Sequence, residues 1–171
     1  MHCGKKLNLS TIDFKMPLLE KQLLIKKSQI PGAGKGLFTK KFIPKGTRII
    51  EYKGKVTTWK QVLSGDKFNG YVYYFNRNHV IDGMGRIKAL GRYANDARGM
   101  TKIKGIVNNT RYVEDGKKVF MEAVKDIPEK TEILVSYGVD YWKVLKDNKK
   151  ISDREQKLKL KERQKLPDKK L

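Results

Sequence analysis

The chain has 171 residues, 39% of them hydrophobic, and a formal charge of +21 at pH 7. This length suffices for one hydrophobic core and is short for two, so we expect one domain with charged ends. No run approaches the roughly 18 apolar residues of a membrane-spanning helix, and the first residues lack the pattern of a secretory signal. We therefore expect an intracellular protein, cytoplasmic or nuclear, with no membrane partner.

The cysteine, histidine and charge content narrows the chemistry further. Cys3 is the single cysteine, which excludes an internal disulfide framework or a multi-cysteine zinc cluster. His2 and His79 are the only histidines, and we expect no bound metal. The excess of 39 basic over 18 acidic residues attracts polyanions, so electrostatic contact with nucleic acid is one interpretation. A surface that merely keeps the protein soluble is the other.

Composition and turn residues divide the chain into three parts. We expect a flexible leader over residues 1–17, a β-rich domain over residues 18–142, and a basic helical segment over residues 143–171. Proline and glycine turns separate short runs with the character of β-strands. These runs cover residues 23–28, 36–40, 47–56, 71–75, 79–82, 106–113, 117–124 and 132–137.

Three local signals are sharper than the rest. Asp115-Gly116 between two β-rich runs predicts a hairpin, and short helices are expected over residues 58–63 and 87–93. Residues 143–171 carry 12 Lys or Arg and 5 Asp or Glu, with Leu and Ile in one thin stripe, which predicts an exposed helix. Its positive charge fits either simple solvation or contact with nucleic acid.

A glycine-rich turn offers the first candidate for ligand binding. Gly34-Lys35-Gly36 lies between two predicted strands, where backbone amides and carbonyls approach a ligand that a side chain would block. A dinucleotide site would place a helix after these glycines, and no phosphate-binding Gly-Lys-Ser/Thr loop is present. Taken alone, a segment of this kind is more often a tight turn than a cofactor site.

Several blocks in a fixed order resemble the SET-domain protein lysine methyltransferases along residues 20–142. Their order is more specific than any one of them. The blocks are Gly34-Lys35-Gly36, Glu51 to Lys55, Tyr71-Val72-Tyr73 leading to Ile81-Asp82, Arg92 to Ala97, Asn108-Asn109-Thr110, and Ser136-Tyr137-Gly138.

The resemblance implies a mainly β (α+β) fold of several small sheets, with a SET-type catalytic domain over residues 18–142. It implies a knot-like core in which the segment ending at Tyr137 passes beneath the loop that holds Asn95. It also implies S-adenosylmethionine as cofactor, without a metal, and a lysine side chain as methyl acceptor. The implied cofactor-binding residues are Gly34, Lys35, Gly36, Arg92, Tyr93, Asn95 and Asp96. Trp142, which follows the last block, fits either a cover for the cofactor or an anchor of the final helix on the core.

The same resemblance places Tyr137 at the point of methyl transfer, in a substrate-lysine channel with Tyr52, Tyr71 and Val135. Tyrosines in strands are commonly packing residues, so Tyr52 and Tyr71 fit either role. Val135 stands where the family often has Phe or Tyr, and its smaller side chain leads us to expect di- or trimethylation.

Asp96 departs from the family pattern, which has histidine at this position, and an altered cofactor site is expected. We therefore expect S-adenosylmethionine-dependent methylation of lysine on a protein substrate that is histone-like, associated with nucleic acid, or ribosomal. The alternative is a catalytically silent module with the SET fold that binds protein or nucleic acid. The sequence leaves the oligomeric state open.

Overall fold

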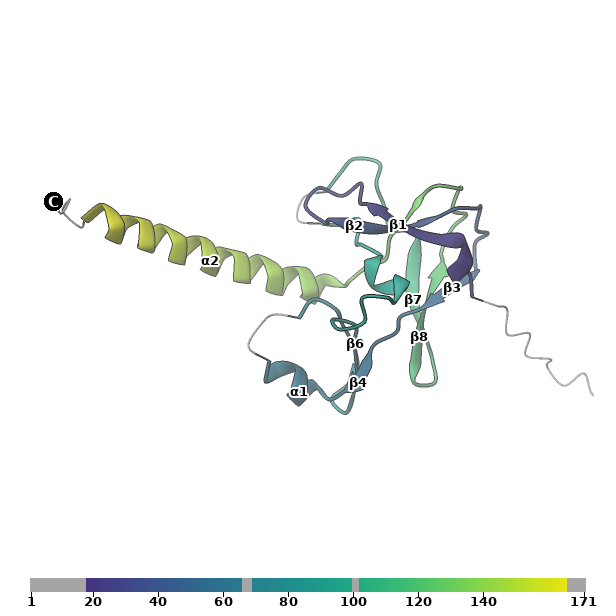
Figure 1. Cartoon of the computed structure of the whole chain (residues 1–171), viewed down its shortest axis with the longest axis horizontal. Helices are drawn as coiled ribbons and strands as arrows, with labels where there is room; N and C mark the ends of the chain where they lie inside the picture. Colours follow the sequence, from purple (N-terminus) through teal and green to yellow (C-terminus); the bar gives the residue numbers. More distant parts are fainter. Residues whose placement is uncertain (1–17, 66–68, 100–101, 166–171) are drawn as a thin grey trace, which may run out of the picture.

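The computed structural model describes residues 18–65, 69–99 and 102–165. The leader expected over residues 1–17, with Cys3 and His2, lies outside this part of the chain. Three small antiparallel sheets form the body of the molecule, from which one long helix extends (Figure 1). The expected β-rich class with a basic C-terminal helix is confirmed.

Each sheet has three strands. The first contains β1 (Leu23–Lys27), β2 (Lys35–Thr39) and β9 (Glu132–Ile133), the second β3 (Arg48–Glu51), β8 (Lys118–Ala123) and β7 (Thr110–Asp115), and the third β4 (Lys55–Thr57), β6 (His79–Asp82) and β5 (Val72–Asn76). Apolar side chains buried between the sheets form the main core, because burial removes their surface from water. Fully buried members of this core include Leu37, Ile43, Ile49, Val119, Met121, Ile127 and Ile133.

Local signals explain several elements. Strands β7 and β8 pair as a hairpin in which Asp115 opposes Lys118, and Gly116 takes the positive φ of 60° that the turn requires, as predicted. Helix α1 (Trp59–Leu63) begins after Thr58, whose side chain and that of Gln61 form a capping box. The helix expected over residues 87–93 is shorter, a 3-10 turn η2 at Leu90–Tyr93; another such turn, η1, covers Glu20–Gln22.

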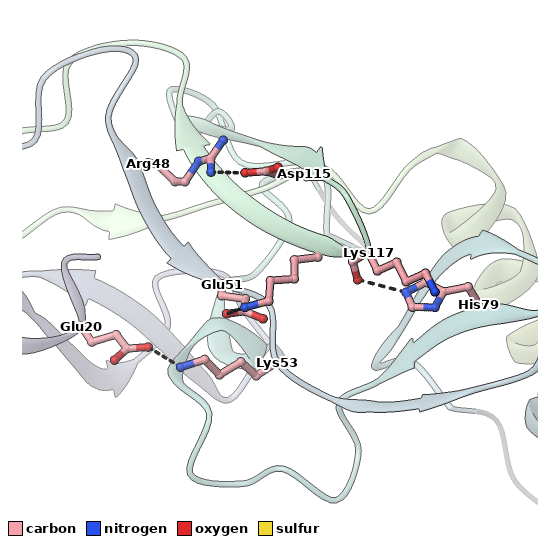
Figure 2. Close-up of polar contacts among 8 residues, drawn as sticks. Glu20, Arg48, Glu51, Lys53, His79, Asp115 and Lys117 are labelled. Carbon is pink, nitrogen blue, oxygen red and sulfur yellow. Dashed lines mark hydrogen bonds and ion pairs between the residues drawn. The ribbon is translucent and has the colours of Figure 1, made fainter. Parts of the chain in front are cut away.

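Polar contacts on the surface tie the hairpin to its neighbours (Figure 2). Arg48 on β3 pairs with Asp115 on β7 at 2.7 Å, and the ring of His79 on β6 makes a 3.0 Å hydrogen bond with the carbonyl of Lys117. Exposed ion pairs of this kind contribute about 1 kcal/mol or less each. Through its hydrogen bond to Lys117, His79 links β6 to the hairpin and has a structural role in this fold.

The segment after β9 joins parts of the chain that are distant in sequence. The amide of Val135 donates to the carbonyl of Asn95 at 2.8 Å, and the amides of Asn109 and Thr110 donate to the carbonyl of Leu134 at 3.1 and 3.0 Å. The segment thus lies between the Asn95 loop and the start of β7, in the position expected for the threaded core.

Helix α2 (Val139–Lys165) begins four residues before the boundary expected at residue 143. Tyr141 and Trp142 therefore lie in its first turn. Trp142 is buried, whereas every side chain from Lys146 to Leu158 is exposed. The helix is anchored at one end and extends away from the body (Figure 1).

Candidate functional site

Two cavities meet at the junction of the Asn95 loop, the segment after β9 and the first turn of α2. One, the loop cavity, has a volume of about 760 Å³ and is bordered by residues 30–35; the other, the tyrosine cavity, has a volume of about 400 Å³. Both volumes fall in the range of small-molecule sites. The residues that line both cavities are Gly70, Tyr71, Arg92, Tyr137 and Tyr141.

Backbone from the glycine-rich turn forms one side of the loop cavity. Gly32 and Gly34 have φ values of 79° and 70°, a left-handed conformation that side chains disfavour. The opposite side carries Tyr93, Asn95 and aromatic groups of α2. This combination presents peptide groups and aromatic faces to one space.

Glu132 holds the glycine-rich turn in place through hydrogen bonds. The sequence analysis did not identify this residue. Its carboxylate is 1% exposed and accepts hydrogen bonds from Ser28 Oγ at 2.7 Å, the amide of Gln29 at 2.8 Å and Asn95 Nδ2 at 3.2 Å. Asn95 Nδ2 also donates to the carbonyl of Lys35 at 3.0 Å. One buried carboxylate thus holds both sides of the loop cavity. An isolated acidic residue in the apolar run EILV was the available signal.

Asp96 is the centre of a second buried network. Its Oδ2 accepts from Trp142 Nε1 at 2.7 Å and from the amide of Tyr137 at 2.8 Å, and its Oδ1 accepts from the amide of Arg98 and from Asn108 Nδ2, both at 2.9 Å. Burial raises the pKa of this carboxyl, but the four hydrogen bonds outweigh burial and the net pKa is lowered. The carboxylate is ionised, and both of its oxygens accept two hydrogen bonds.

Tyr137 occupies the wall between the cavities. Its hydroxyl donates to the carbonyl of Ala94 at 2.8 Å, and its ring lies edge-on to Tyr141 and parallel to Trp142. Burial, followed by the neighbouring Tyr141, raises the pKa of Tyr137 far above its ordinary value of 10.0. The phenol therefore stays neutral, with an oxygen lone pair free to accept a hydrogen bond.

Seven of the eight tyrosines of the chain line the tyrosine cavity. Arg92 is the one charged side chain among the described residues that line it. The Arg92 guanidinium lies 4.1 Å from the centre of the Tyr71 ring, and its Nε is buried without a hydrogen-bond partner in the described residues. The seven tyrosines are Tyr52, Tyr71, Tyr73, Tyr74, Tyr112, Tyr137 and Tyr141.

Hydrogen bonds hold these rings in place. Tyr52 donates to the carbonyl of Tyr71 at 2.9 Å, and Tyr73 donates to Glu114 at 3.1 Å. Burial, followed by the charge of Glu114, raises the pKa of Tyr73 to about 12. The wall of the tyrosine cavity is thus aromatic, with the Arg92 guanidinium as its charged member.

Most residues singled out from the sequence meet here. Tyr52, Tyr71 and Tyr137 line the tyrosine cavity. Gly36 and Val135 line neither cavity: Gly36 packs on Glu132, and Val135 is fully buried in the core. The space available to a substrate is therefore not set by Val135 in this structure. The expected cofactor-binding residues that line the loop cavity are Gly34, Lys35, Arg92, Tyr93, Asn95, Asp96 and Trp142.

Across residues 18–65, 69–99 and 102–165, no group of three His, Cys, Asp or Glu side chains is arranged to hold a metal ion. Within the same ranges, none of the helices has the length and apolar character needed to cross a bilayer.

Comparison with known proteins agrees with this arrangement. Residues 34–138 match the SET domain. The histone-lysine N-methyltransferase set-17 of Caenorhabditis elegans is 28% identical over 135 residues, which are 78% of this chain and 46% of that protein. The chain thus spans about half the length of this curated relative.

A solved structure extends the comparison to the fold. The methyltransferase domain of human PR domain-containing protein 2 superposes with a TM-score of 0.51 at 23% identity, over 72% of this chain and 80% of that one. At this identity the likeness shows the fold alone. Because the family match covers more than half of its residues, the chain belongs to the SET-domain family.

Proposed function

We propose that the protein transfers methyl groups from S-adenosylmethionine to lysine side chains of a protein substrate. The observation that carries this proposal is the common wall of the two cavities, formed around Tyr71, Arg92 and Tyr137. Methyl transfer needs a donor and an acceptor that approach from opposite sides along one line. Two adjacent cavities with different linings meet that requirement.

The loop cavity suits the donor. S-adenosylmethionine carries an amino-acid end, a sulfonium and an adenine, and the cavity offers backbone groups at Gly34 and Lys35, the Asn95 amide and aromatic rings. Arg92 lines this cavity, and its guanidinium cation attracts the carboxylate of the cofactor. Asp96, although its carboxylate is engaged elsewhere, keeps Trp142 in the wall of this cavity.

The tyrosine cavity suits a lysine side chain. Its aromatic wall packs on the aliphatic stem. A free lysine has a pKa near about 10.4, and only the neutral amine has a lone pair for attack. The Arg92 cation disfavours an ammonium beside it, so the proton is lost to solvent before transfer. No side chain is required to act as a strong base.

Tyr137 orients the amine. Its hydroxyl proton points to the Ala94 carbonyl, which leaves the oxygen as an acceptor for the amine N–H. When bound, the cofactor supplies a methyl group on a cationic sulfur, and the C–S electron pair stays on the sulfur as the N–C bond forms. Tyr141 and Trp142 keep the Tyr137 ring fixed on two sides.

We infer the substrate class from the relative set-17 and from the net positive charge of this chain. The name of set-17 describes it as acting on histone lysine. We extend this to the present chain as a histone-like or other protein associated with nucleic acid, because a protein of charge +21 is attracted to polyanionic assemblies.

The test is a radiolabelled methyl-transfer assay on histones, ribosomal proteins and a DNA-binding protein, with wild type and Tyr137→Phe. Without the hydroxyl, we expect the rate to fall about 10- to 100-fold because the amine is no longer oriented. Isothermal titration with S-adenosylmethionine should give the same affinity for both proteins. Full transfer by Tyr137→Phe would contradict the assigned role.

The second candidate function is a catalytically silent module with the SET fold, and the same titration tests it. Absence of measurable heat with S-adenosylmethionine, together with absence of label transfer on every substrate, would favour the module. Binding without transfer would point instead to a substrate outside the panel, which mass spectrometry of labelled cell extract identifies.

A further inference from the structure

Helix α2 carries a row of basic residues on one face. Lys143, Lys146, Lys150, Arg154 and Lys157 follow each other at intervals of three or four residues, and all are exposed. This spacing aligns side chains along one side of a helix. With a rise of about 1.5 Å per residue, the row extends for about 21 Å. In the sequence, Lys161 and Lys165 continue the same spacing.

Acidic residues of the same helix neutralise the row only in part. Among the described residues, Lys150 is the one member with an ion pair, to Asp147 at 3.3 Å. Like charges three and four residues apart weaken a helix, and an isolated helix with no buried face gains no packing energy to compensate. Asp140, Asp147 and Asp153 lie three or four residues from members of the row and offset part of this repulsion, whereas Lys146 and Arg154 have no acidic residue at these spacings. A polyanion along the exposed row would remove the repulsion that is left.

The row continues onto the body of the molecule. At the base of α2 lies a hollow of about 470 Å³ whose charged lining has four basic residues, Arg98, Lys143, Lys146 and Lys150, and two acidic ones, Asp140 and Asp147. Arg98 is exposed and belongs to the same loop as Asp96, whose carboxylate accepts its amide. The basic surface therefore reaches the loop that borders the loop cavity.

We propose that this basic row, together with Arg98, binds the phosphate backbone of double-stranded DNA. A straight row of cations about 21 Å long fits a duplex, which carries one phosphate charge per about 1.7 Å of its axis. DNA held along α2 brings proteins bound to that DNA next to the two cavities. The DNA contact is independent of the catalytic proposal, whereas this consequence for substrate choice depends on it.

The test compares two charge-matched variants of the full chain by fluorescence anisotropy on a labelled 20-base-pair duplex, between 50 and 200 mM NaCl. Each loses five positive charges through substitution by Gln, which preserves helix propensity. The row variant carries Lys143→Gln, Lys146→Gln, Lys150→Gln, Arg154→Gln and Lys157→Gln. The control variant carries Lys27→Gln, Lys41→Gln, Lys45→Gln, Lys55→Gln and Lys125→Gln, all at exposed positions outside α2.

We expect the row variant to bind at least about tenfold more weakly at 100 mM NaCl, and its salt slope to fall by about four, because each lost phosphate contact removes about 0.9. The control should change less than about threefold. Equal weakening of both variants, or no binding by wild type, would overturn the proposal. Tighter binding of polyglutamate than of DNA would overturn it too, by assigning the row to an acidic protein.

Circular dichroism at 222 nm checks that both variants keep their helix. The anisotropy assay contains neither cofactor nor methyl acceptor, so its result stands whether or not the protein transfers methyl groups. With the row variant, we further expect transfer to a short histone peptide to be unchanged and transfer to DNA-bound histones to fall toward the peptide rate.

Discussion

The indole Nε1 of Trp142 donates a 2.7 Å hydrogen bond to Oδ2 of Asp96, 46 residues earlier in the chain. The same oxygen accepts the amide of Tyr137 at 2.8 Å. A single carboxylate oxygen thus fixes both the first turn of α2 and the residue in the wall between the cavities. The resemblance to the family implies a histidine at this position, and a histidine has no carboxylate to accept these two hydrogen bonds.

Replacing Asp96 by Ala should destabilise the fold. The change leaves four donors without an acceptor, and each buried unsatisfied group costs about 1–3 kcal/mol, so we expect a loss of about 2–4 kcal/mol in the free energy of unfolding after relaxation. Urea denaturation measures it. Asp126→Ala is the control, because the exposed Asp126 accepts only the amide of Lys45 in the described structure, and we expect less than about 1 kcal/mol. Equal losses would refute the network.

The stabilisation by Asp96 should depend on pH in a defined direction. Its folded-state pKa lies below the ordinary value of 3.8, so the stabilisation is complete above that value and is lost as the pH falls through the folded-state pKa. We expect the difference in unfolding free energy between wild type and Asp96→Asn to be constant from about pH 5 to 7 and to shrink below about pH 4. A difference that grows in acid would show that the carboxyl is protonated in the fold.

Trp142 should report on cofactor binding. The chain has two tryptophans, so Trp59→Phe leaves Trp142 as the single indole, in the wall of the loop cavity. We expect S-adenosylmethionine to change its emission in a saturable way, because the cofactor would contact or shield the ring. In the reciprocal variant, Trp142→Phe, the emission of Trp59 should stay constant, since Trp59 lines neither cavity.

Gly36 and Gly85 make a matched pair for testing the packing beneath the loop cavity. A Cβ on Gly36 would overlap the carboxylate of Glu132, whereas a Cβ on Gly85 meets no atom within 4 Å. Gly36→Ala should lose about 1–3 kcal/mol of stability and weaken cofactor binding, because Glu132 must release Ser28 or Asn95. Gly85→Ala should be neutral or stabilising by up to about 1 kcal/mol. Differential scanning calorimetry of both variants measures these changes in stability.

Much of the fold could be predicted from the sequence because its signals are local. Alternation and turn residues located the β-rich runs, and Asp115-Gly116 predicted the hairpin with its turn. The run over residues 47–56 was predicted as one strand but forms β3 and β4 in two different sheets, because tertiary pairing divides it. The helix boundary at Val139 was missed, since the charge change on which the prediction relied begins later than the helix.

By itself, the sequence determined the order of the SET-family blocks, the glycine-rich turn at Gly34-Lys35-Gly36 and the charge of the C-terminal helix, because each can be read directly along the chain. Only the tertiary structure decided the partners of Asp96 and Glu132, the burial of Val135 and the meeting of seven tyrosines around one cavity. The physical reason is distance along the chain: Glu132 bonds Ser28 across 104 residues, and no local periodicity encodes that contact.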